Sequence, residues 1–134
     1  MARILLVDDD TDLLAGQKAF LEKSGYRVDT ATTIDDGVGK AAAGKPDVII
    51  ADLMMEHYDS GFVFCKKVRE LPDMAKVPII MQTAAARKVG FTFEPGATGG
   101  SEWMKVDEVL TKPVPLEYLL GKIEQYLSKK TRKG

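Results

Sequence analysis

Short apolar runs alternate with segments of helical periodicity along the 134 residues of the chain. This alternation predicts a parallel sheet with helices on both faces, because parallel strands need crossover connections that are usually helical. The apolar runs cover residues 3–7, 27–31, 47–51, 77–82 and 107–111. In open sheets of this class, ligands bind outside the carboxyl ends of the strands. One crevice is therefore expected to collect the residues that directly follow four of the runs, which are Asp8, Asp52, Thr83 and Lys112.

The segments between the runs carry signals for where helices begin and end. Right-handed crossovers favour the flavodoxin-like strand order 2-1-3-4-5. From 84 to 105, glycines, a proline and aromatic residues replace the periodicity, so a fourth helix there is expected to be short, displaced or followed by a long loop. The clearer helices are one capped by Asp10 or Thr11 and ended by Gly25, one over 35–43, one bearing Phe64, Val68 and Leu71, and one with an apolar stripe from Leu116 to Leu127.

Length and charge narrow the class of protein. The chain suits one domain, with a core from about 3 to 127 and a basic tail at 128–134. Nineteen basic and twenty acidic residues leave a formal charge of −1, so we expect neither a nucleic-acid nor a membrane partner. No apolar stretch approaches the roughly 20 residues that span a bilayer. Cys65 is the only cysteine, which excludes an internal disulfide and predicts a cytoplasmic location.

The acidic residues at the strand ends suit a divalent cation. Carboxylates that converge there would repel one another, and a hard cation relieves that repulsion. Magnesium prefers one or two carboxylates, a carbonyl oxygen and waters. We therefore expect a magnesium site made by Asp8, Asp9, Asp52 and the backbone carbonyl of Met54.

The same crevice suits phosphoryl transfer to an aspartate. Asp52 is the candidate nucleophile, because a carboxylate can accept a phosphoryl group while the metal shields its charge. Lys112 would neutralise a phosphate oxygen as a point charge. The hydroxyl of Thr83 and the backbone N–H of Ala84 would donate hydrogen bonds to the phosphate.

The motifs around these residues clearly resemble the receiver domain of two-component response regulators. The resemblance runs from about Arg3 to Leu127, and it implies a phosphoacceptor at Asp52, a switch hydroxyl at Thr83 and a phosphate-sensing lysine at Lys112. It also implies that Asp8 and Asp9 bind magnesium and that a cis peptide bond precedes Pro113. The motifs are IleLeuLeuValAspAspAsp, ProAspValIleIleAlaAspLeuMetMet, ValProIleIleMetGlnThrAla and ValLeuThrLysProVal, in the family's order.

The family implies a signalling switch and not an enzyme in the usual sense. We expect a stand-alone receiver, similar to the chemotaxis regulators, that takes its phosphoryl group from a histidine kinase or a histidine phosphotransfer protein. It would then pass the signal to a downstream protein target and catalyse its own dephosphorylation. Two positions depart from the family, because Glu56 replaces a common proline and Val109 a common aromatic residue. We therefore predict that phosphorylation acts mainly by ordering or relocating 84–105.

The sequence is also compatible with two other functions. Asp8 to Thr11 resembles the DxDxT signature of haloacid-dehalogenase-like phosphohydrolases, in which Asp8 would be the nucleophile and Asp10 the acid/base. That mechanism also needs a downstream acidic pair at a strand end, for which Asp35-Asp36 and Asp107-Glu108 are the only candidates. The other possibility is an interaction module that keeps the fold without phosphorylation, although the intact set of acids, threonine and lysine argues against it.

Overall fold

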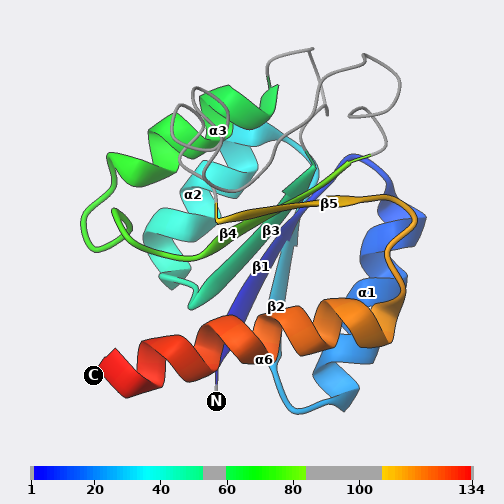
Figure 1. The fold of residues 1–134 in the computed structure, drawn as a ribbon. Coiled ribbons are helices and arrows are strands. Elements are labelled where there is room, and N and C mark those ends of the chain that lie inside the picture. The colour runs from blue at the N-terminus through cyan, green and yellow to red at the C-terminus, as the bar shows by residue number, and fades with distance from the viewer. Residues whose placement is uncertain (1, 53–59, 84–106, 134) are drawn as a thin grey trace.

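The computed structural model describes residues 2–52, 60–83 and 107–133 of the chain. A parallel five-stranded sheet lies at its centre, with the strand order β2-β1-β3-β4-β5 (Figure 1). This confirms both the fold class and the strand order that were predicted. The strands are β1 (Arg3–Val7), β2 (Arg27–Ala31), β3 (Val48–Asp52), β4 (Ile79–Thr83) and β5 (Glu108–Thr111). The helices are α1 (Thr11–Lys23), α2 (Ile34–Gly44), α3 (Ser60–Arg69) and α6 (Leu116–Lys133).

Successive strand residues point to opposite faces of the sheet and so build two cores. Helices α2 and α3 cover one face, and α1 and α6 cover the other (Figure 1). The first core includes Leu5, Val7, Ile34, Ala41, Ile49, Ala51, Phe64, Cys65, Val68, Ile79 and Met81. The second includes Ile4, Leu6, Leu14, Leu21, Val48, Ile50, Ile80, Leu110, Leu119 and Ile123. Full burial of one such aliphatic side chain stabilises a fold by roughly 1.5–3 kcal/mol, so the two cores hold the strand ends firmly in place.

The helix ends follow the local chemistry of the sequence. Asp10 caps α1 by accepting a hydrogen bond from the backbone N–H of Leu13 at 3.0 Å. Thr33 caps α2 in the same way, and Lys45 ends that helix in the left-handed region at φ 46°. After α1 the chain turns at Gly25, where φ of 102° favours a residue without a Cβ.

The element bounds differ from those expected by a few residues. The apolar run begins at 77, and β4 itself begins after Pro78, at Ile79, as expected for a residue that has no N–H to donate. The carbonyl of Pro78 still accepts from Ile49 N at 2.9 Å. α3 ends at Arg69, yet Leu71 still packs against the core beyond the helix end.

The expected tail at 128–134 is largely part of a helix, because α6 continues to Lys133. The division into a core and a tail itself stays a prediction. The fourth helix and the long loop that are expected between 84 and 105 fall outside the described residues. The strand expected after them, at 107–111, is described and forms β5. Within the ranges that are described, no helix is both long and apolar enough to cross a membrane.

Candidate functional site

Three strand ends place chemically active side chains at one edge of the sheet. Asp8 directly follows β1, Asp52 is the last residue of β3, and Lys112 directly follows β5. The order of the strands puts β4 between the strand that carries Asp52 and the strand that leads to Lys112. The lysine therefore reaches across the end of β4 to meet the acids, as the parallel topology predicts.

Asp8 is buried and held by several hydrogen bonds. Its side chain is 1% exposed, and each of its carboxylate oxygens has a partner. Oδ1 accepts from the backbone N–H of Asp10 at 3.0 Å, and Oδ2 accepts from Lys112 Nζ at 2.7 Å. Its own backbone N–H donates to the carbonyl of Ala31 at 3.0 Å. These contacts fix both the position and the orientation of the carboxylate.

Lys112 joins the two buried acids. Its Nζ lies 2.7 Å from Asp8 Oδ2 and 3.0 Å from Asp52 Oδ2. Burial lowers the pKa of Lys112, but the hydrogen bonds and negative charges of the two aspartates outweigh burial, so the pKa lies above its ordinary value. The ammonium group therefore stays charged at neutral pH and offsets part of the negative charge of the site.

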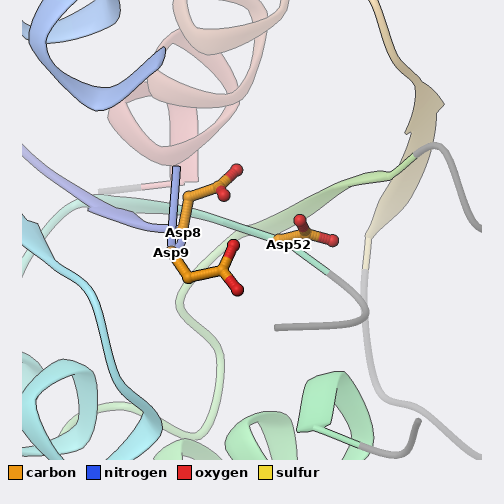
Figure 2. Close-up of side chains that lie close together, drawn as sticks. All are labelled: Asp8, Asp9 and Asp52. Atoms are coloured by element: carbon orange, nitrogen blue, oxygen red, sulfur yellow. The ribbon is translucent and has the colours of Figure 1, made fainter. Parts of the chain in front are cut away.

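Asp9 completes a cluster of three carboxylates with Asp8 and Asp52. One oxygen from each lies within 4.8 Å of the others, and Figure 2 shows the three side chains gathered around the ends of β1 and β3. Asp9 is exposed, whereas the other two are buried. Hard carboxylate oxygens at this spacing fit a magnesium ion that retains several waters on its open side. Asp10, by contrast, caps α1, as expected for an acid that does not belong to the cluster.

Some of the residues expected at the site lie at or beyond the limits of the described chain. Thr83 ends β4 and pairs in register with Thr111, which precedes Lys112, but only the backbone of Thr83 is described. Met54 and Ala84 fall outside the described residues. The peptide bond between Lys112 and Pro113 is cis, as the resemblance implied.

The acidic pairs that a phosphohydrolase would need lie elsewhere. Asp35 and Asp36 belong to the first turn of α2. Asp107 lies before the amino end of β5, where its side chain accepts from the backbone N–H of Ile79 at 2.8 Å. Because β5 is parallel to the other strands, its amino end lies at the edge of the sheet opposite Lys112. Neither pair therefore joins the three carboxylates.

The structure also reveals a buried pair of side chains that the sequence did not predict. The amides of Gln17 on α1 and Gln82 on β4 exchange two hydrogen bonds, at 3.1 and 3.2 Å. Both residues are at most 2% exposed. The available signal was a glutamine within the apolar stripe of the first helix and another within the apolar run before Thr83. Neither alone indicates the other, because they lie 65 positions apart.

Known proteins resemble this chain along nearly its whole length. It is 33% identical to the DNA-binding dual master transcriptional regulator RpaA of Synechocystis over 98% of the chain, and 33% identical to Protein PilH of Pseudomonas aeruginosa over 96% of the chain. The chain spans 52% of RpaA, so about half of that relative, but 99% of PilH. A crystal structure of a CheY-like response regulator receiver domain protein from Methanospirillum hungatei superposes with a TM-score of 0.81 at 26% identity, covering 100% of this chain and 99% of that one.

The family model for the response regulator receiver domain matches residues 4–124. This range contains four of the strands in full and β1 from its second residue onward. It also contains the described members of the site, Asp8, Asp9, Asp52 and Lys112. The match therefore covers the fold and the acidic crevice together. The chain belongs to the response regulator receiver domain family.

Proposed function

We propose that Asp52 is the residue at which this receiver domain accepts a phosphoryl group, and that phosphorylation switches its contacts with other proteins. The main support is that Lys112 lies within hydrogen-bond distance of both Asp8 and Asp52 at the carboxyl edge of the sheet. Of these two acids, Asp52 has the more exposed side chain, at 11% against 1% for Asp8. A phosphodonor can therefore approach Asp52 more easily.

The transfer needs little from the protein except placement and charge. A carboxylate oxygen of Asp52 forms a bond to phosphorus while the bond from phosphorus to the histidine nitrogen of the donor breaks. The imidazole leaves with the bonding electron pair, and Asp52 becomes an acyl phosphate. Lys112 is then placed to exchange its contact with Asp52 for a contact with a phosphoryl oxygen.

Magnesium fits the donor set of this site. Asp8, Asp9 and Asp52 would supply carboxylate oxygens, and the carbonyl of Met54 is proposed as a further ligand. When bound, the ion would reduce the repulsion between these carboxylates and the oxygens of the incoming phosphoryl group. The lysine neutralises only one charge of the three acids, which leaves the site with net negative charge for a cation.

Thr83 and Ala84 are the proposed donors on the other side of the phosphoryl group. The support for this role is their sequence position, since Thr83 ends the strand that lies between those leading to Asp52 and Lys112. The hydroxyl of Thr83 and the backbone N–H of Ala84 would bind phosphoryl oxygens. Movement of these donors toward the phosphate would carry the signal into the segment that follows.

Receiver domains in general act with histidine kinases and with downstream targets. For this chain we propose a histidine kinase or a histidine phosphotransfer protein as donor and a protein as target, in the cytoplasm. We also propose that the domain catalyses its own dephosphorylation, by attack of water on the phosphorus of the acyl phosphate. Loss of phosphate from the isolated domain, followed by intact mass after removal of the donor, tests this last activity.

Intact mass measured after incubation with acetyl phosphate and magnesium tests the acceptor. The wild type should gain one phosphoryl group, and Asp52→Asn should gain none. Asp10→Asn is the matched control, because asparagine also caps helices well and Asp10 makes the capping hydrogen bond outside the carboxylate cluster. It should label like the wild type.

The same experiment separates the alternatives. Labelling that survives Asp52→Asn but is lost in Asp8→Asn would indicate the phosphohydrolase chemistry. That mechanism lacks support, because both oxygens of Asp8 are engaged and Asp10 caps a helix. Absence of any labelling in the wild type, with magnesium present, would favour an interaction module that is not phosphorylated.

A further inference from the structure

The two buried glutamines form a directional contact between α1 and β4. Gln17 Nε2 donates to Gln82 Oε1 at 3.1 Å, and Gln82 Nε2 donates back to Gln17 Oε1 at 3.2 Å. Within the described ranges, the other buried polar or charged residues are Asp8 and Asp52 of the acidic site. Among the described residues, the amide pair is therefore the one contact between buried, uncharged polar side chains.

Stability alone is a weak explanation for such a pair. A buried amide must regain the hydrogen bonds that it made to water, so the net gain is small, and two apolar side chains of similar shape can replace the pair at little cost. Apolar side chains, however, do not make contacts of fixed direction. Two reciprocal hydrogen bonds fix the relative position of the two backbones, whereas apolar contacts tolerate sliding.

The pair lies where such a constraint affects the acidic site. Gln82 pairs in register with Asp52 on the neighbouring strand, and it directly precedes Thr83. Gln17 belongs to α1, whose capping residue Asp10 donates its backbone N–H to Asp8. Helix α1 thus contacts the acidic site through its capping residue, and it holds β4 near its carboxyl end through the amide pair.

From this arrangement we propose that Gln17 and Gln82 are positioning residues for Thr83. Their paired amides hold the carboxyl end of β4 against α1, and this fixes the backbone of Thr83 relative to Asp52. The inference rests on the proposed function, since it concerns how well Thr83 is placed to bind the phosphoryl group on Asp52. Without the pair, β4 keeps its apolar contacts, but its end is held less firmly and the hydroxyl binds the phosphoryl oxygens less well.

The variant Gln17→Met with Gln82→Met tests this inference. Methionine is unbranched like glutamine and suits a helix equally well, so the change removes the hydrogen bonds and largely keeps the shape. The readouts are the affinity for beryllofluoride, a mimic of the phosphoryl group, at saturating magnesium, and the affinity for magnesium alone. We expect beryllofluoride to bind roughly three- to tenfold more weakly, the size of coupling usual between residues in contact. Magnesium affinity should stay within about twofold, because the carboxylates keep their partners.

Repeating the measurement in the Thr83→Ala background separates an effect that acts through Thr83 from a general structural effect. If the pair acts through Thr83, replacing both glutamines in the Thr83→Ala background should weaken beryllofluoride binding no further. An equal loss with and without Thr83 would overturn the inference, and so would wild-type affinity in the methionine pair. A second apolar pair, Gln17→Leu with Gln82→Val, carries the same expectations and serves if the methionine pair does not fold. Failure of the wild type to bind beryllofluoride would instead overturn the proposed function.

Discussion

Replacement of Lys112 by methionine should destabilise the protein strongly in the absence of magnesium. The change removes the cation that contacts Asp8 at 2.7 Å and Asp52 at 3.0 Å, and it leaves two buried carboxylates facing each other. Loss of one partner from a buried ion pair usually costs about 3–5 kcal/mol. Because the lysine side chain is 21% exposed, we expect the lower end, about 3 kcal/mol of unfolding free energy.

Magnesium should reverse part of this loss. In the variant the ion meets three carboxylates without a competing ammonium group, so saturating magnesium should stabilise Lys112→Met by about 1 kcal/mol or more beyond its effect on the wild type. Urea denaturation with and without magnesium measures both quantities. Adding Asp8→Asn to Lys112→Met should recover part of the stability, since it removes one of the uncompensated charges.

Lys18→Met is the matched control for this experiment. Lys18 pairs with Glu22 on the surface of α1 at 4.0 Å, and both side chains are more than 40% exposed, at 44% and 48%. Its loss should cost less than about 0.5 kcal/mol, with no dependence on magnesium. If Lys112→Met costs no more than Lys18→Met, or if magnesium stabilises both variants equally, the lysine does not balance the charge of the acidic site.

Three further predictions concern the metal, alkaline pH and packing. Asp9→Asn should weaken magnesium binding at least about tenfold in calorimetric titration, because it removes a full charge from an open site; unchanged affinity would exclude Asp9 from the ligands. Burial raises the pKa of the Cys65 thiol from 9.0 to about 12, so its contribution to stability is complete below pH 9 and is lost as pH rises toward 12. Between pH 9 and 12 the unfolding free energy should fall more steeply in the wild type than in Cys65→Ala, by up to about 1.4 kcal/mol per pH unit. Equal slopes of unfolding free energy against pH in the two proteins would contradict this. Gly37→Ala should lower the unfolding free energy by about 1–3 kcal/mol, because its Cβ would lie 2.9 Å from the ring of Phe64. Gly39→Ala should not lower it, because its Cβ would meet no neighbouring side chain within 4 Å. Equal thermal midpoints in these two variants would refute the packing argument.

The sequence predicted the part of the site that depends on topology alone. Asp8, Asp52 and Lys112 each end or follow an apolar run, and parallel strands bring such positions to one edge without any knowledge of side-chain packing. The strand order followed from the preference for right-handed crossovers. The roles of Thr83, Met54 and Ala84 stay predictions, because the structure describes neither the side chain of Thr83 nor residues 54 and 84.

The remaining features depend on three-dimensional packing. The pairing of Gln17 with Gln82 requires the rotation of α1 about its axis and its distance from β4, neither of which a periodic pattern supplies. Gln17 lies among apolar residues at helical spacing, a pattern that is consistent with its burial but indicates no partner. The start of β4 could be predicted, because Pro78 has no N–H for the ladder and the strand begins directly after it.

The location of the phosphoryl group in the wild-type protein tests whether Asp52 is the phosphoacceptor. The domain can be phosphorylated with acetyl phosphate and magnesium, and borohydride then reduces the acyl phosphate to a homoserine residue that peptide mass spectrometry locates. We expect this reduction at Asp52 alone, and only when both phosphodonor and magnesium are present. Reduction at Asp8, or none at Asp52 under conditions in which the intact mass shows phosphorylation, would contradict it.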